Sequence, residues 1–396
     1  MKAILPLVLL GGCVEKLPGE VTGTQSIRVE VTSPTNPGGP GKNERLADSA
    51  RAVTMNLTAI GPDGSADTSL TTDLQVYSQF LGTLTPSLEE PPLKTIRMTN
   101  GVANGQTLTL PSTFGPTTIW VDDGQSDSPT YATGTSVTLW YRDPFISDLQ
   151  KPPDETVNEA MFRSPLETKQ IAVNGSKYGD NGRLIVTSIF AQGYTVSDAM
   201  CGAGGAPPCT AMAYDHMMVF SFSAPRDQLG RLLLEGQVID GFTGGVSEFN
   251  GLTEIGFPST TAPEVVDHNP ARLPAPAAFD PMWFGPVSDP MGRINLEKNE
   301  AAPIAITGAT VCPLDDDFDT YKQWKISPSG TAACSDDDSV LSVITSGVIS
   351  DLDMAKLSSL EGTALPRVVG VLRPVSIGGF NVWIIYPRSP ADVTLP

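Results

Sequence analysis

The residues of this chain that could do chemistry are carboxylates, cysteines and aromatic rings, because only two of its 396 residues are histidines. Asp315, Asp317 and Asp319 stand at alternate positions, the spacing at which an EF-hand loop presents oxygen ligands to Ca²⁺. Thr320 and Ile326 occupy the sixth and twelfth positions, where such a loop requires glycine and glutamate. We therefore expect at most weak Ca²⁺ binding, with a solvated acidic loop as the favoured alternative and no other cofactor.

Four of the five cysteines fall into two local pairs, Cys201 with Cys209 and Cys312 with Cys334. Four cysteines can be joined in three ways, but each local pair lies within one candidate domain, which favours the two local disulfides. Neither a Cys-x-x-Cys spacing nor neighbouring histidines support a metal site instead. Disulfides are typical of exported proteins.

Several aromatic side chains in strand-like segments could form a ligand-binding face. The candidates are Tyr194, Phe220, Trp324 and Trp383. Rings on the face of a small barrel can stack on bases or sugars, and the alternative is that the same rings fill the barrel cores. The sequence lacks a Gly-x-Ser-x-Gly nucleophile motif, a phosphate-binding loop and a His-Glu-x-x-His zinc motif. We therefore expect no catalytic residues and a non-enzymatic protein.

The charge of the chain is strongly acidic. Lys and Arg together number 25 and Asp and Glu 44, which gives a formal net charge of −19. Such a field repels phosphate backbones, so nucleic acid is not expected as a partner, whereas carbohydrate or an envelope protein remains open. The 38 glycines and 35 prolines interrupt helices and favour short strands joined by turns.

The N-terminus has the pattern of an export signal. A short apolar run at residues 3–10 is too short to span a bilayer as a helix. Small residues and a cysteine follow it in Leu10-Gly11-Gly12-Cys13. This arrangement resembles the lipobox of bacterial lipoproteins, in which the cysteine is acylated and becomes the new N-terminus.

The lipobox resemblance implies where the protein resides. It implies that residues 1–12 are a signal peptide, that Cys13 carries the acyl chains and that residues 13–26 are a tether. Acyl chains anchor a protein because each buried methylene group contributes about 0.8 kcal/mol. Val14 stands where an aspartate would retain a lipoprotein in the inner membrane. The resemblance therefore implies the outer membrane, at its periplasmic face or at the cell surface.

Residues 27–147 have the pattern of an all-β domain. The runs 27–31 and 52–60 alternate apolar and polar residues with period 2, as half-buried strands do. Further strand-like runs separated by turns follow, at a spacing that suggests a β-sandwich. The segment resembles bacterial immunoglobulin-like domains. Prolines then predict an extended linker at residues 148–165.

The spacing of strand-like runs in residues 166–262 predicts a small barrel of five strands. Its strands are expected at residues 183–190, 193–198, 215–222, 231–240 and 248–255. Gly193-Tyr194 and the run from Glu248 to Glu254 resemble the second and last strands of OB-fold modules beside secreted bacterial nucleases and phosphatases. Leu229-Gly230-Arg231 departs from the Gly-Asp-Arg usual in that family.

The pattern recurs after a second expected linker at residues 263–292. The second OB-like barrel is predicted at residues 293–396. Its strands are expected at residues 302–312, 323–327, 340–344, 367–372 and 380–388, with a short helix at 351–360. The overall expectation is an all-β chain with an immunoglobulin-like sandwich followed by two five-stranded OB-like barrels.

Two functions are compatible with this organisation. The first is an outer-membrane lipoprotein, held to the lipid bilayer through Cys13, that acts as a binding or envelope-assembly module. The alternative is an accessory or degenerate member of a secreted nuclease or phosphatase system that binds nucleic acid or another polyanion through its OB folds. The strong net negative charge favours the first.

Overall fold

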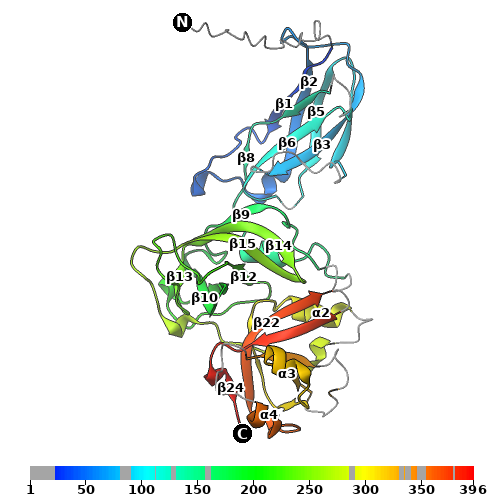
Figure 1. Cartoon of the computed structure of the whole chain (residues 1–396). Helices are drawn as coiled ribbons and strands as arrows, with labels where there is room; N and C mark the ends of the chain where they lie inside the picture. The colour runs from blue at the N-terminus through cyan, green and yellow to red at the C-terminus, as the bar shows by residue number, and fades with distance from the viewer. Residues whose placement is uncertain are drawn as a thin grey trace, which may run out of the picture. The chain divides into compact units, whose positions relative to one another are not determined.

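The chain is mostly β-structure, with a few short helices and three curled sheets. A computed structural model describes residues 23–80, 91–111, 113–125, 131–156, 162–284, 290–329, 334, 340–345, 354–377 and 380–396. Cys13 lies outside these residues. The chain divides into two compact units, unit 1 (Met1–Tyr141) and unit 2 (Arg142–Pro396) (Figure 1). The expected all-β class is confirmed at this level.

Unit 1 contains one eight-stranded sheet. Its strands are β1 (Ser26–Ser33), β2 (Ala52–Ile60), β3 (Thr72–Phe80), β4 (Lys94–Met98), β5 (Val102–Thr109), β6 (Pro116–Asp122), β7 (Thr133–Thr135) and β8 (Leu139–Trp140). They follow the order β4-β3-β6-β7-β1-β2-β5, with β8 paired to β6. All pairs are antiparallel except that of β1 with β7. The alternation in β2 buries Met55 and Leu57 against Leu74 of β3 and Ile119 of β6.

The first sheet of unit 2 is curled, and two strands that follow one another in the chain lie near its opposite ends. Its strands are β9 (Gln170–Val173), β10 (Gly182–Phe190), β11 (Gly193–Met200), β12 (His216–Phe220), β13 (Val238–Ile239), β14 (Gly241–Phe249) and β15 (Leu252–Thr261). The order is β13-β10-β11-β12-β15-β14-β9. β12 and β15 are parallel, and every other pair is antiparallel. Because β9 pairs with β14 while β10 pairs with β11, the β9–β10 segment closes the curl.

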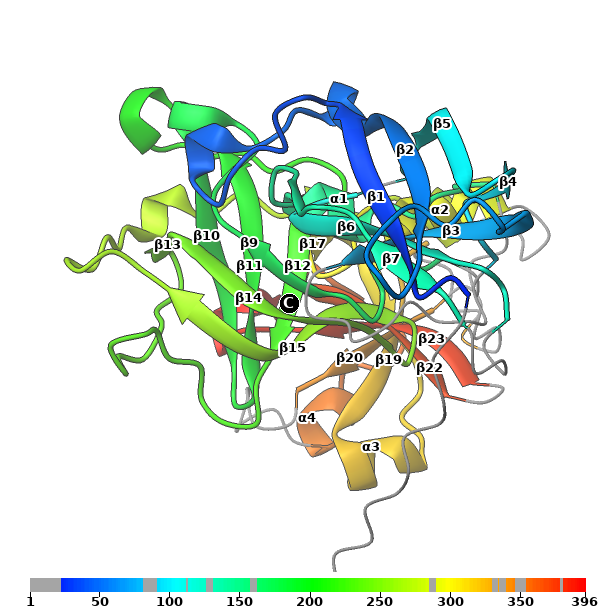
Figure 2. The ribbon, with the colours of Figure 1, turned by 90° about the horizontal axis from the view of Figure 1, so that it is seen from above.

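The second sheet of unit 2 repeats this arrangement. Its strands are β16 (Ala277–Ala278), β17 (Pro303–Ile306), β18 (Ala309–Val311), β19 (Gln323–Ser327), β20 (Leu341–Ile344), β21 (Ala364–Leu365), β22 (Arg367–Ile377), β23 (Phe380–Tyr386) and β24 (Val393–Thr394). The order β17-β22-β23-β20-β19-β18 matches the first sheet strand for strand, and β20 and β23 form the equivalent parallel pair. Figure 2 shows β19, β20, β22 and β23 gathered together.

Four short α-helices accompany the sheets of unit 2 in the part of the chain that the structure describes. They are α1 (Ile146–Gln150), α2 (Pro290–Glu297), α3 (Asp316–Tyr321) and α4 (Met354–Ser358). α4 falls within the helix expected at residues 351–360 and lies between β20 and β22 in the chain. Residues 351–353, at the expected start of that helix, lie outside the described residues.

The prediction of two linkers was wrong, because both segments carry apolar side chains that the sheets of unit 2 bury. Unit 1 ends at Tyr141, so the boundary precedes the expected linker at residues 148–165. Leu149 and Phe162, which lie within that expected linker, are buried. In the expected linker at residues 263–292, β16 pairs with β17, and a set of aromatic residues joins the core of the second sheet: Phe279, Trp283 and Phe284.

Some predicted strands were wrong in extent. The expected strand at residues 248–255 is a hairpin, in which β14 and β15 are joined by Asn250-Gly251 with φ of 53° and 83°. Asn-Gly accepts positive φ at both positions, so it favours a tight turn over a continuous strand. The expected strand 302–312 is likewise divided into β17 and β18 at Gly308, whose φ is 68°. Only β13 forms within the expected strand 231–240.

Candidate functional site

Three of the four aromatic residues predicted to form a ligand face lie in the core, so that part of the prediction was wrong. Tyr194, Trp324 and Trp383 are 0%, 1% and 3% exposed. The hydroxyl of Tyr194 lies 2.7 Å from that of Thr260, and the two tryptophans pack in the core of the second sheet. A small closed sheet needs large apolar side chains to fill its interior. Phe220 is the exception, because it is half-buried and lines a cavity.

A cavity of about 1010 Å³ lies between the two curled sheets of unit 2. This volume is at the upper end of the range typical of small-molecule sites. The first sheet contributes side chains from β12, β14 and β15, and the second from β19, β20, β22 and β23. Its apolar lining consists of Met218, Phe220, Phe222, Val246, Phe249, Leu252, Phe257, Ile344, Pro374, Val375, Ile384 and Tyr386.

The cavity opens to solvent between phenylalanine rings. Phe222, Phe249 and Phe257 line it and are 66%, 61% and 82% exposed. The ring of Phe222 lies 5.3 Å from that of Phe220 and 5.2 Å from that of Phe257, measured between centroids. Exposed apolar side chains gathered in one place commonly mark a binding surface. We call Phe222, Phe249 and Phe257 the phenylalanine rim.

The backbone at the rim is strained. Phe257 has a φ of 51°, a conformation in which the Cβ of a bulky residue meets its own backbone. Such strain costs on the order of 1–3 kcal/mol and is concentrated at functional sites. A ring that is both exposed and strained contributes little to folding, so its position points to a role at the cavity.

Two ionisable side chains lie among the apolar ones. Glu254 extends from β15, and burial raises the pKa of its carboxyl group, which the charge of Arg373 opposes. Arg373 extends from β22, and its guanidinium lies 4.5 Å from the centre of the Tyr386 ring. Its Nε is buried without a hydrogen-bond partner among the described residues. The cavity therefore holds one acidic and one basic group, and the basic group has a buried N–H without a partner among the described residues.

The strand alternation positions these groups. In β15, Leu252, Glu254 and Gly256 lie two residues apart and share the side that lines the cavity. In the second sheet, Arg373 is paired with Ile384 across β22 and β23. Gly256 leaves room here, because a Cβ at this position would meet only the carbonyl oxygen of Gly245, at 3.9 Å.

The Ca²⁺ site predicted at Asp315, Asp317 and Asp319 is not supported. Residues Asp316–Tyr321 form α3, so the backbone here is a helix rather than an EF-hand loop, and the side chains of Asp317 and Asp319 lie outside the described ones. Asp315 instead pairs with Lys325 at 3.3 Å. Among the residues that the structure describes, no group of histidine, cysteine or carboxylate side chains could hold a metal ion.

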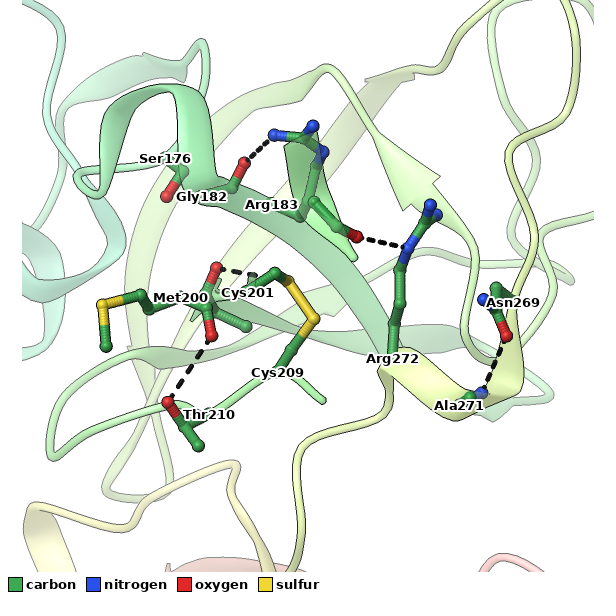
Figure 3. Close-up of a disulfide and its surroundings, with 12 residues drawn as sticks. Ser176, Gly182, Arg183, Met200, Cys201, Cys209, Thr210, Asn269, Ala271 and Arg272 are labelled. Atoms are coloured by element: carbon green, nitrogen blue, oxygen red, sulfur yellow. Dashed lines mark hydrogen bonds between the residues drawn. A yellow bond between two sulfur atoms is a disulfide. The ribbon is translucent and has the colours of Figure 1, made fainter. Parts of the chain in front are cut away.

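Both disulfides expected from the sequence, Cys201–Cys209 and Cys312–Cys334, are present. Figure 3 shows the first, whose loop is also held by two guanidinium groups. Arg183 donates from Nη2 to the carbonyl of Gly204 at 2.8 Å, and Arg272 donates from Nε to that of Gly205 at 2.8 Å. These contacts stabilise the loop, and the two disulfides leave none of these four cysteines as a free thiol.

The histidines do not form a catalytic centre. The Nδ1 atom of His216 lies 2.7 Å from the hydroxyl of Ser197, but both residues are buried. Burial lowers the pKa of His216 to about 3, so the ring is neutral at pH 7. The Nε2 atom of His268 lies 2.9 Å from the carbonyl oxygen of Glu235, next to a β-bridge with Gln237. Both histidines are explained by structural roles.

The sequence analysis missed the residues that give the cavity its character. Phe249, Glu254, Phe257 and Arg373 all come from regular strands, and no motif distinguishes them. The Asn250-Gly251 dipeptide was the available signal, because recognising a hairpin there would have placed Phe249 at a strand end. The facing residues of β22 could not be found without knowing how the two sheets pack.

Comparison with protein-family models, curated proteins and solved structures found no match for this chain. Among the described residues, no helix is long and apolar enough to cross a membrane.

Proposed function

We propose that this chain is an exported, non-enzymatic binding protein that holds an apolar ligand in the cavity of unit 2. The observation that carries the proposal is the phenylalanine rim at the mouth of a cavity lined by both curled sheets. Apolar surface exposed in this way costs free energy in water, about 25 cal/mol per Å² that a ligand would cover. The two disulfides support an oxidising, extracytoplasmic location.

The proposal includes the fold families expected from the sequence. We propose that the two sheets of unit 2 are OB-like, which is supported by their shared strand order, their parallel pairs and the position of α4 between β20 and β22. We propose an immunoglobulin-like sandwich for unit 1, which is supported by its antiparallel strands and the parallel pairing of β1 with β7. OB folds bind varied ligands, so the function rests on the cavity rather than on the fold.

Binding of a neutral apolar probe tests the proposal. We expect the fluorescence of N-phenyl-1-naphthylamine to increase when it binds the protein, and Gly256→Leu to weaken this binding because the new side chain fills the cavity. Gly61→Leu in unit 1 is the matched control, since a Cβ there meets nothing closer than 3.5 Å. A wild-type protein that leaves the probe fluorescence unchanged, or equal binding by both variants, would refute the proposal.

The proposed location is the outer membrane, through an acylated Cys13. In the native host, Cys13→Ser should move the protein from the membrane to the soluble fraction, because the acyl chains provide the anchor. Incorporation of labelled palmitate by the wild type but not by the variant is the accompanying measurement. A variant that still fractionates with membranes contradicts this location without affecting the cavity.

A further inference from the structure

We infer that the ligand of the cavity is a single-chain amphiphile whose carboxylate binds Arg373 while its hydrocarbon chain lies along the phenylalanine side chains. The inference rests on the proposed function and specifies the chemistry of the ligand. It depends on the arrangement of charge in the cavity, which is independent of the apolar lining that carries the proposed function.

Arg373 is the basic group of the cavity among the described residues that line it. Its guanidinium lies over the ring of Tyr386, and its Nε is buried without a hydrogen-bond partner among the described residues. A buried N–H group of an arginine ordinarily has a hydrogen-bond partner, because an unpaired one loses a strong, charge-assisted interaction. A ligand oxygen is therefore the missing acceptor.

The planar fork of a guanidinium matches a carboxylate or a phosphate. Glu254 favours a carboxylate over a phosphate as the ligand head group, because its own carboxyl group lies close enough to interact electrostatically with Arg373. A phosphate monoester carries a charge between about −1.5 and −2 at pH 7 and would meet stronger repulsion from Glu254 than a carboxylate would.

The rest of the cavity accommodates a chain. Val375 and Ile384 lie on the same side of the second sheet as Arg373, and Phe220 and Leu252 face the cavity from the first sheet. The rim rings are exposed, so a chain whose head group is bound at Arg373 can extend along apolar side chains toward the phenylalanine rim. Burial of a chain in this way contributes about 0.8 kcal/mol for each methylene group.

Competition against N-phenyl-1-naphthylamine tests the inference with the full-length protein. The competitors are dodecanoate, dodecanol and dodecyl phosphate, which share one chain length and differ in the head group. We expect dodecanoate to bind at least about tenfold more tightly than dodecanol, since a charge-assisted hydrogen bond at a partly buried site corresponds to at least that ratio. Dodecyl phosphate should be weaker than dodecanoate.

Two variants assign the preference to the charged pair. Arg373→Gln should abolish the difference between dodecanoate and dodecanol, whereas Arg367→Gln, an exposed arginine on the same strand, should preserve it. Glu254→Gln should tighten dodecanoate binding and leave dodecanol unchanged. These outcomes would support the inference.

Other outcomes would overturn it. Equal binding of dodecanoate and dodecanol by the wild type refutes the amphiphile while leaving the proposed apolar site intact. Tighter binding of dodecyl phosphate refutes the choice of a carboxylate. Absence of probe binding refutes the proposed function itself. The wild-type comparison of head groups needs no variant, so the inference stays falsifiable if Arg373→Gln does not fold.

Discussion

Glu300 is a buried acid whose surroundings favour the protonated form of its carboxyl group. Its Oε1 accepts a hydrogen bond from the backbone N–H of Thr253 at 3.0 Å, while its Oε2 has no partner among the described residues. The Nε2 of Gln150 donates to the carbonyl of His216 at 2.6 Å, which leaves Gln150 Oε1 equally unpartnered. The side chains of Gln150 and Glu300 are within hydrogen-bonding reach of each other. A proton on Glu300 Oε2 would satisfy both oxygens.

This protonation makes stability depend on pH. Burial, with the charges of Glu297 and Glu248, raises the pKa of Glu300 well above its ordinary value of 4.5. Between pH 4.5 and that raised pKa the folded chain binds more protons than the unfolded chain, so the stability from this group is complete below pH 4.5 and declines as pH rises. Each unit of the shift corresponds to about 1.4 kcal/mol.

Glu300→Gln should therefore stabilise the protein at pH 8 relative to the wild type and have little effect at pH 4.5. The amide can still accept from Thr253 and can donate to Gln150 without titrating. Urea unfolding at the two pH values measures the effect, with the exposed Glu264→Gln as the control. A variant that is equally or less stable at pH 8 would show that Glu300 is charged in the folded protein.

The strain at Phe257 predicts that this residue can be replaced without loss of stability. Asn tolerates positive φ, and the ring is 82% exposed, so Phe257→Asn should raise the free energy of unfolding by up to about 1 kcal/mol. It should also weaken N-phenyl-1-naphthylamine binding. Phe222→Asn, at a residue without positive φ, should weaken binding without stabilising. A clearly destabilised Phe257→Asn would mean that the ring packs in the folded core.

At the scale of elements, the two disulfides close loops of different length. The sequence separation is 8 residues for Cys201–Cys209 and 22 for Cys312–Cys334. Loop-closure entropy predicts a contribution of about 2.5 kcal/mol for the shorter loop and about 1 kcal/mol more for the longer one. Denaturation of the two double alanine variants measures the difference. Greater destabilisation by Cys201→Ala/Cys209→Ala would show that the contacts of Arg183 and Arg272 outweigh loop length.

Period-2 patterning predicted strands where one face of the strand is buried, as in β1 and β2. It failed at Asn250-Gly251, where the apolar pattern continues through a tight turn. The expectation of a linker also failed at residues 263–292, where Phe284 is buried in a core. Burial depends on how distant segments pack, and for the same reason the pattern could not distinguish the buried Trp324 from Phe220 at the cavity.

At the scale of the whole molecule, the acidic field predicts poor binding of nucleic acid. The formal net charge is −19, and among the described lining residues Arg373 alone is basic. Stacking on the phenylalanine rim could contribute about 1–3 kcal/mol per base, but affinity for phosphate chains comes mainly from released counterions at basic side chains. We expect no complex with single-stranded DNA at physiological salt in fluorescence anisotropy. A micromolar complex that weakens steeply with salt would favour the polyanion-binding alternative.

Because the cavity lies between two sheets, the stability of unit 2 depends on the concentration of its ligand. A ligand that touches both β15 and β22 is lost when either sheet unfolds, so its binding energy opposes the separation of both. The added stability grows with the logarithm of the free ligand concentration, by about 2.7 kcal/mol when that concentration is a hundred times the dissociation constant. The melting temperature of unit 2 would then report how much ligand its compartment contains.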